Sequence, residues 1–196
     1  MAEKVDRRVR KTKAQLRAGL ARLMQKKSIK EITVKELVDE VDINRSTFYL
    51  HYSDIYQMLE SIETELMDEI AQVIEEHPLD LVKNGSSYPM IEHIFTILDN
   101  NKDICIALLG SNGDMGFVSR MEKMVADTVL RQLSGKFAAD NHDVEYVYAF
   151  CLNGCVGMIK AWLSSEHRES TKHIAELTNR MIENTTHDFL RQIPNA

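Results

Sequence analysis

The sequence predicts an all-α protein of about nine helices, with a small three-helix head at its N-terminal end and a larger helical body after it. Three observations lead to this fold class. Apolar residues recur every three or four positions in nearly every segment, which is the spacing of one helix face. Only 8 glycines and 3 prolines occur in 196 residues, which is too few for a turn-rich β-sandwich. No segment shows the sustained apolar–polar alternation of a strand.

The head is predicted from residues 1–53 and contains three helices. Apolar spacing predicts the first helix over about residues 6–26. A capping box begins the second helix: the Thr33 hydroxyl accepts from the Glu36 amide, and the Glu36 carboxylate reaches back. After a tight turn, Asn44 caps a third helix that runs to about His51.

The body is predicted from residues 54–196 and contains six helices. A long helix begins near Ser53 and ends before Pro78. Five further helices are indicated by apolar faces within residues 91–98, 104–109, 117–128, 144–163 and 174–182. The fourth of these is apolar almost all round, so we expect it to be buried on several sides.

Charge is distributed unevenly along the chain, whose net charge is −6. Residues 1–30 hold 11 Lys/Arg and 2 Asp/Glu, whereas residues 56–196 hold 11 and 22. A basic head on an acidic body is expected where one end meets a polyanion. A solvated basic helix without a partner gives the same pattern, and charge alone leaves both readings open.

Several classes of protein are not favoured by the sequence. There is no run of 18 apolar residues typical of a membrane span, and the N-terminus lacks the apolar core of a signal peptide. We therefore expect a cytoplasmic protein without a membrane partner. No catalytic motif such as G-x-S-x-G or H-E-x-x-H occurs, and the seven histidines lack metal-ligand spacing. The sequence predicts no enzyme, no metal site and no cofactor.

The three cysteines, Cys105, Cys151 and Cys155, do not form a disulfide framework. Cys151 and Cys155 lie four positions apart on one predicted helix, so both sulfurs face the same side. A redox sensor needs cationic neighbours, and the neighbours here are apolar. Filling of the core is therefore the favoured role of these side chains.

Residues 33–52 contain two short helices joined by a three-residue turn, which is a helix-turn-helix. Its second helix is of the kind that lies in the major groove of DNA. Arg45 is placed to reach guanine O6 and N7, whereas Phe48 and Tyr52 point into the core. The full set of predicted DNA-binding residues is Thr33, Lys35, Asn44, Arg45, Ser46, Thr47, Tyr49, His51, Arg8 and Lys11. Among them, hydroxyl and imidazole groups are natural donors to phosphate.

The segment Thr47-Phe48-Tyr49-Leu50-His51-Tyr52 resembles the T-F/L-Y-x-H-F/Y signature of the TetR/AcrR family of one-component transcriptional regulators. This resemblance covers roughly residues 8–60. A second element resembles the G-x-x-G-x-I-x-x-W-L pattern of a subgroup and consists of Gly154, Gly157, Ile159, Trp162 and Leu163. Two positions depart from the family pattern: Ile55 replaces the usual lysine, and Leu50 stands where many members have a basic or polar residue.

The resemblance implies a homodimer with two DNA-binding heads, an all-α ligand-binding body, and dimerisation through the last two long helices. It also places Thr33, Arg45, Thr47, Tyr49 and His51 on DNA-contacting positions. The apolar faces of those two helices are too large for the surface of a monomer. The predicted dimer interface consists of Tyr148, Leu152, Val156, Ile159, Trp162, Ile174, Leu177 and Met181.

The body is rich in methionine, a side chain that adapts to varied ligands, so a pocket for an apolar small-molecule effector is predicted. Ordinary core packing is the alternative for each residue. The predicted pocket residues are Met58, Ile62, Leu66, Ile94, Phe95, Met121, Met124 and Met158.

The function predicted from these features is that of a repressor which an effector releases from its double-stranded DNA operator. The effector would favour one arrangement of the body and so change the spacing of the two heads. The alternative is a co-regulator of the same fold that acts through a protein partner and does not read DNA.

Overall fold

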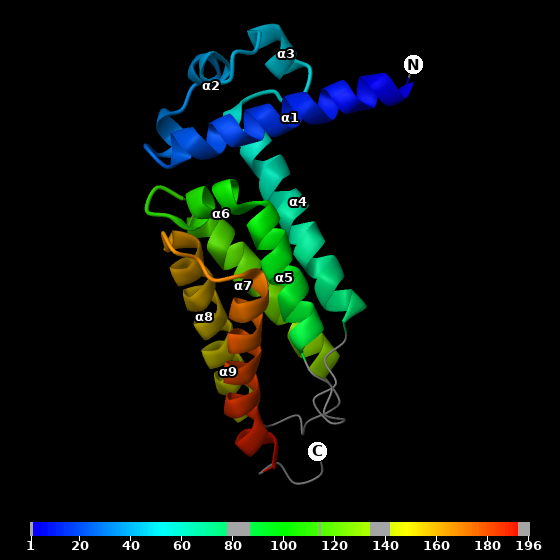
Figure 1. The fold of residues 1–196 in the computed structure, drawn as a ribbon, viewed down its shortest axis with the longest axis vertical. Coiled ribbons are helices and arrows are strands. Elements are labelled where there is room, and N and C mark those ends of the chain that lie inside the picture. The colour runs from blue at the N-terminus through cyan, green and yellow to red at the C-terminus, as the bar shows by residue number, and fades with distance from the viewer. Residues whose placement is uncertain (1, 78–86, 114, 134–141, 192–196) are drawn as a thin grey trace. The chain divides into compact units, whose positions relative to one another are not determined.

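The computed structural model describes residues 2–77, 87–113, 115–133 and 142–191, and every regular element in these ranges is helical (Figure 1). The α-helices are α1 (Ala2–Met24), α2 (Val34–Glu40), α3 (Arg45–Tyr49), α4 (Ile55–Glu76), α5 (Tyr88–Asn100), α6 (Lys102–Leu109), α7 (Met115–Leu133), α8 (His142–Ser164) and α9 (Thr171–Arg191). Within the described residues, the prediction of an all-α fold with about nine helices is confirmed.

One short 3-10 helix, Ile29–Glu31, was not predicted. Ser28 accepts a hydrogen bond from its first turn, and the Glu31 carboxylate accepts from the Ser28 backbone N–H at 3.1 Å. This is a complete capping box, and the pattern S-x-x-E that signals it is present in the sequence. The turn carries the chain from the end of α1 to the start of α2.

The chain divides into two compact units, and the division differs from the boundary expected after residue 53. The first unit contains Met1–Leu66 and Asn101–Val118, and the second contains Met67–Asn100 and Ser119–Ala196. Residues 101–118 join the first unit because α6 packs against α1, and residues 54–66 also belong to it. On α6, the side chains of Ile104, Cys105 and Leu108 are buried.

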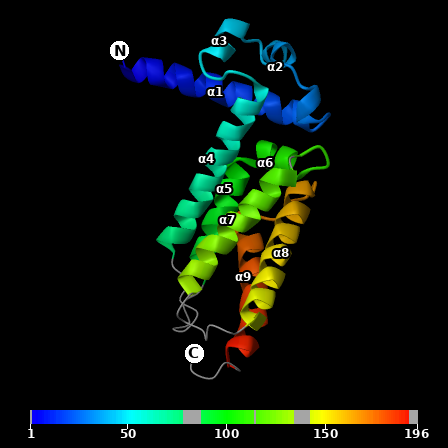
Figure 2. The same ribbon diagram turned by 180° about the vertical axis from the view of Figure 1, so that it is seen from behind.

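In the first unit, α2 and α3 lie on one side of α1 and α6 lies on the other (Figures 1 and 2). Leu16 and Leu20 of α1 are fully buried. The helical spacing of apolar residues along α1 therefore reflects real burial, and α1 forms the centre of this unit.

In the second unit, α9 packs against both α5 and α8 (Figure 1). Phe95 of α5 meets Trp162 of α8 edge to face, with ring centroids 5.3 Å apart. The Trp162 indole Nε1 donates to the Glu169 carbonyl at 2.9 Å. Arg168 lies over the Trp162 ring and pairs with Asp99 at 3.2 Å. These contacts tie the connection between α8 and α9 to α5.

The turn between α2 and α3 contains a strained residue. Asp42 has φ 52°, which makes it the one described non-glycine residue with positive φ. Side chains other than Asn and Asp are disfavoured there by about 1–2 kcal/mol. We expect the Asp42→Val variant to be about 1–2 kcal/mol less stable than the Asp42→Gly variant, as measured by urea unfolding. Equal stabilities of the two variants would show that the turn does not require this conformation.

Candidate nucleic-acid interface

Both predicted helix caps of the helix-turn-helix are present. The Thr33 hydroxyl accepts from the backbone N–H of Glu36 at 3.2 Å and so begins α2. The Asn44 side-chain oxygen accepts from the backbone N–H of Ser46 at 2.9 Å and so begins α3. Each cap satisfies an amide that has no partner within its helix. The sequence therefore fixes where both helices start.

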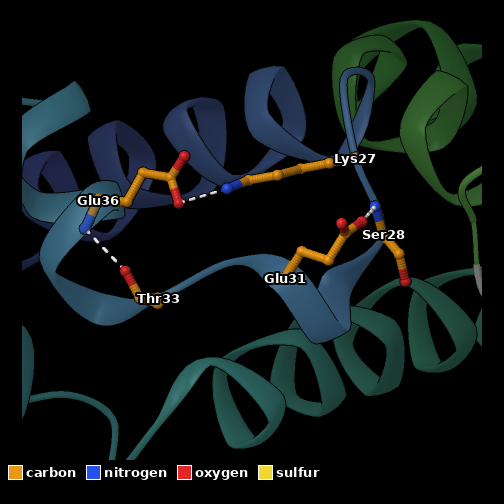
Figure 3. Close-up of polar contacts among 5 residues, drawn as sticks. All are labelled: Lys27, Ser28, Glu31, Thr33 and Glu36. Carbon is orange, nitrogen blue, oxygen red and sulfur yellow. Dashed lines mark hydrogen bonds and ion pairs between the residues drawn. The ribbon is translucent and has the colours of Figure 1, made fainter.

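The carboxylate half of the predicted Thr33–Glu36 capping box is not formed. The Glu36 carboxylate instead pairs with the Lys27 ammonium at 2.6 Å (Figure 3). Lys27, in the turn after α1, offers a full charge, which an uncharged backbone N–H does not. The interaction ties the start of α2 to the turn that follows α1, and so helps to hold the helix-turn-helix in place.

Two further features hold α2 against α1. Arg22 pairs with Glu40 at 2.7 Å, and this hydrogen bond lowers the pKa of the Glu40 carboxyl. Gly19 allows a close approach, since a Cβ there would meet Val41 Cγ1 and lie 3.1 Å from Leu37 Cδ1. A larger residue at this position would push the two helices apart.

The core beneath α3 follows the predicted pattern. Phe48 is fully buried and Tyr52 is nearly so, which confirms that they point into the core. Their rings lie 5.8 Å apart, and the Lys13 ammonium lies 5.8 Å from the centroid of the Tyr52 ring. Burial raises the pKa of Tyr52, so its hydroxyl stays protonated at neutral pH. With Phe48 and Tyr52 inward, the opposite side of α3 is left to solvent.

The solvent side of the first unit carries the residues predicted to bind DNA. Eight of the ten are exposed: Arg8, Lys11, Thr33, Lys35, Asn44, Arg45, Ser46 and Tyr49. Thr47 and His51 are partly exposed. On α3, an Arg45 guanidinium nitrogen donates to the Tyr49 hydroxyl at 3.0 Å. The structure thus gathers polar and basic groups around a short helix that is free on one side.

The two departures from the family pattern have different structural roles. Ile55 is 4% exposed, so its side chain packs in the core and offers no group to phosphate. Leu50, at the end of α3, is 80% exposed and offers an apolar group beside Tyr49. An exposed apolar side chain at this place suits a thymine methyl group or a protein surface.

The helix α8 of the body has an exposed apolar face, and the dimer interface predicted from the sequence does not include all of its residues. On α8 the exposed positions include Tyr146, Phe150, Gly154 and Gly157, which recur at helical spacing, and the two aromatic residues are 74% and 68% exposed. No atom lies within 4 Å of a Cβ built on either glycine, apart from the helix itself. We call these four residues the α8 stripe. Glycines beside exposed aromatic residues permit close approach of another helix.

Some of the residues predicted for the dimer interface serve the inside of one chain instead. Trp162 and Ile174 are 5% and 8% exposed, so they are core residues here. The Tyr148 hydroxyl is buried, and burial raises its pKa. Leu152, Val156, Ile159 and Leu177 are partly exposed, and Met181 is 53% exposed. A helix that is apolar all round does not show in its sequence which face is inward.

The predicted pocket residues are divided between the units. Met58, Ile62 and Leu66 are buried in the first unit. Ile94, Phe95, Met121, Met124 and Met158 belong to the second unit. Phe95 packs on Trp162, and the Met158 sulfur accepts from the Thr178 hydroxyl at 3.8 Å. For these two residues the structure shows packing partners within the chain.

Of the three cysteines expected to fill the core, Cys105 is buried, whereas Cys151 and Cys155 are partly exposed. Burial raises the pKa of Cys151 and that of Cys155, the latter to about 11. No group of three or more metal-ligating side chains occurs among the described residues.

We expect iodoacetamide to modify Cys155 at about pH 7.5 at least about tenfold more slowly than a free cysteine, because little thiolate is present below the raised pKa. The rate should rise as pH approaches 11. Mass spectrometry of the peptides provides the measurement, and the chain unfolded in urea is the control. Modification as fast in the folded chain as in urea would contradict the raised pKa and favour a reactive thiol.

One described helix has the length and composition of a membrane span. It is the segment Asp143–Ser164 of α8, and only 11% of its most apolar 18-residue window is buried within the chain. The core helix of a soluble protein would be mostly buried, whereas most of this window is not buried within the chain. The α8 stripe lies within it.

The sequence matches a family model, and the fold is similar to those of several solved structures. Residues 85–184 match a family model described as the C-terminal region of transcriptional regulators, TetR type. No curated protein matches the chain.

Among solved structures, a TetR transcriptional regulator from Streptococcus agalactiae 2603V is similar with TM-score 0.57 at 20% identity, covering 93% of this chain and 99% of that one. A tetR-family regulator from Streptomyces coelicolor has TM-score 0.57 at 16% identity, covering 89% and 81%. The dihydroxyacetone kinase operon activator DhaS has TM-score 0.57 at 13% identity, covering 93% and 98%. At these identities the likeness concerns the fold.

Proposed function

Because the chain belongs to the TetR family of transcriptional regulators, we propose that it is a repressor that binds a DNA operator as a homodimer and is released by a small-molecule effector. The main support for the proposal is that α3 exposes polar and basic side chains on its solvent side. A short helix, capped by Asn44 and anchored through buried Phe48, presents Arg45 and its polar neighbours to solvent. Such a helix suits the major groove.

Charge on the first unit supports a DNA partner. Two acidic side chains of α2, Glu36 and Glu40, are paired with Lys27 and Arg22 of the preceding segment. Their repulsion of phosphate is thereby reduced, while Arg8, Lys11 and Lys35 remain exposed. Phosphate contacts of this kind give affinity and position the protein without reading sequence.

The α8 stripe supports a second copy of the chain as the partner of the body. Regulators of this family generally bind DNA and dimerise. An isologous contact through α8 and α9 would bury Phe150 and Met181 of both copies and use the open space at Gly154 and Gly157. The membrane-like composition of α8 is then explained by a protein interface, in keeping with a family that is in general soluble and cytoplasmic.

The effector is proposed to bind in the second unit, where Met121, Met124 and Ile94 are partly exposed. Flexible methionine side chains adjust to apolar ligands of different shape. To act as an inducer, the ligand must bind the released state more tightly than the DNA-bound state by several kcal/mol; a change from about 1:99 to 99:1 needs about 5.5 kcal/mol.

The experiment that tests the DNA-binding role compares Arg45→Ala with Lys35→Ala on the duplex the protein prefers and on random duplex. We expect Arg45→Ala to weaken binding to the preferred duplex by about 1–3 kcal/mol and to relax preference at one base position. We expect Lys35→Ala to weaken binding to both duplexes alike and to reduce the salt slope by about 1. Fluorescence anisotropy at several salt concentrations measures both effects. Equal loss on both duplexes for Arg45→Ala would contradict its base-reading role.

A second function has one specific observation in its favour. Leu50 and Tyr56 are 80% and 57% exposed, which gives the first unit apolar groups that suit a protein partner. A co-regulator of this kind would bind all duplexes weakly and equally. The same anisotropy series separates the two functions, because only a DNA reader distinguishes the preferred duplex from the random one.

A further inference from the structure

Arg45 and Tyr49 form a closed pair on the exposed side of α3. They are the first and last residues of the helix and lie one turn apart. The Arg45 Nη2 donates to the Tyr49 hydroxyl oxygen at 3.0 Å, and the guanidinium carbon lies 5.5 Å from the centroid of the Tyr49 ring. Two interactions therefore hold the long arginine side chain in one place before any ligand is bound.

The contact leaves the donors needed for base reading. A guanidinium carries five N–H groups, and the bond to Tyr49 uses one of them, so one two-pronged edge remains open. The Tyr49 hydroxyl accepts in this bond, so its own hydrogen is available to donate to a phosphate oxygen. One residue can thus orient the arginine and contact the DNA backbone at the same time.

Holding the side chain in place has an energetic consequence. A free arginine at the surface loses much rotamer freedom when it docks against a base, and this loss weakens binding. An arginine that is already held loses less. The gain applies only where the open edge finds matching acceptors, which in the major groove are O6 and N7 of guanine. The hold therefore increases the difference between the right base and a wrong one.

We propose that Tyr49 is a positioning residue that holds the Arg45 guanidinium for a guanine edge, so that the pair, and not Arg45 alone, sets base preference. The proposal rests on the proposed function, in which α3 lies in the major groove. It gives Tyr49 a role beyond the phosphate contact expected from the sequence. A tyrosine that contacts phosphate alone would affect all duplexes equally, whereas a positioning tyrosine affects discrimination.

The test uses the full-length chain and a duplex selected by it from a pool of random sequences. In this duplex each guanine is replaced, one at a time, by 7-deazaguanine, which lacks the N7 acceptor. The wild type should lose at least about fivefold in affinity at one guanine in each half-site, the low end of the range for a bidentate contact. Arg45→Ala should show no loss at that guanine, which identifies the base that Arg45 reads.

The decisive variant is Tyr49→Phe, which keeps the ring beneath the guanidinium and removes the hydroxyl that accepts from Arg45. We expect its 7-deazaguanine penalty at that guanine to fall to about twofold or less, from the wild-type fivefold or more. Tyr56→Phe removes the hydroxyl of another exposed tyrosine in the first unit and is the matched control; it should keep the full penalty. Melting temperatures verify that every variant is folded.

A penalty in Tyr49→Phe equal to that of the wild type would overturn the positioning role while leaving DNA binding intact. Sensitivity of Arg45→Ala to 7-deazaguanine equal to that of the wild type at every guanine would overturn the assignment of Arg45 as the reader of guanine N7. Failure of the wild type to select any duplex would instead contradict the proposed function itself. The outcomes therefore distinguish failure of the inference from failure of the function on which it rests.

Discussion

Replacement of Phe150 by glutamate is expected to convert the proposed dimer to folded monomers and to weaken binding to the proposed operator by at least about 100-fold. The side chain is 68% exposed on α8, in the middle of the α8 stripe. Aromatic residues at the centre of an interface commonly contribute about 2 kcal/mol or more, and an unpaired buried charge adds a further penalty. A dimer with two heads also binds DNA far more tightly than one head does.

Sedimentation equilibrium at micromolar concentration measures the assembly, and circular dichroism verifies the fold. Thr64→Glu adds the same charge at an exposed position on α4 and should leave the dimer unchanged. Phe150→Ala, which adds no charge, should weaken the dimer to an intermediate degree. If Phe150→Glu remains a dimer of wild-type strength, the α8 stripe is not the interface.

Replacement of Phe48 by alanine is expected to lower the free energy of unfolding by about 3–5 kcal/mol, the usual range for a buried phenylalanine. Phe48 is fully buried and meets the rings of Tyr49 and Tyr52 at 5.5 and 5.8 Å. The cavity would remove the support of α3, so DNA binding should be lost at temperatures where the wild type is folded. Urea unfolding measures the change.

The variant Leu50→Ala provides the control for Phe48→Ala. Leu50 lies two residues further on and is 80% exposed, so Leu50→Ala should change stability by no more than about 0.5 kcal/mol. A similar loss of stability in both variants would contradict the inward–outward arrangement of α3.

The helix-turn-helix could be predicted from the sequence because its determinants are local. Thr33 and Asn44 cap helices through amides two or three residues away, and Phe48 and Tyr52 share a face through their spacing. The partner of the Glu36 carboxylate could not be predicted from its nearest neighbours in the sequence. This carboxylate was expected to close the capping box, but Lys27, nine residues earlier, competes for it. Only the path of the chain brings that ammonium near.

Long-range packing could not be predicted in the same way. Nothing in residues 102–109 indicates that α6 packs against α1. Because α8 has apolar residues on every side, its sequence does not show which of them are buried. Trp162 packs on Phe95, whereas Phe150 is exposed. Such a helix shows the amount of apolar surface in its composition, whereas the inward face is set by partners that are distant in sequence.

We propose that a dimer of this chain reads a specific DNA sequence through α3. The most direct measurement is selection of duplexes from a random pool by the full-length protein, followed by anisotropy of the enriched duplex and of a scrambled one at increasing salt. We predict two symmetry-related half-sites about 10 base pairs apart, or a multiple of that spacing. Affinity should fall linearly with salt on a log–log scale for both duplexes, and the enriched one should bind at least about 1,000-fold more tightly. A pool without enriched sequences, with the same affinity for every duplex, would contradict the claim.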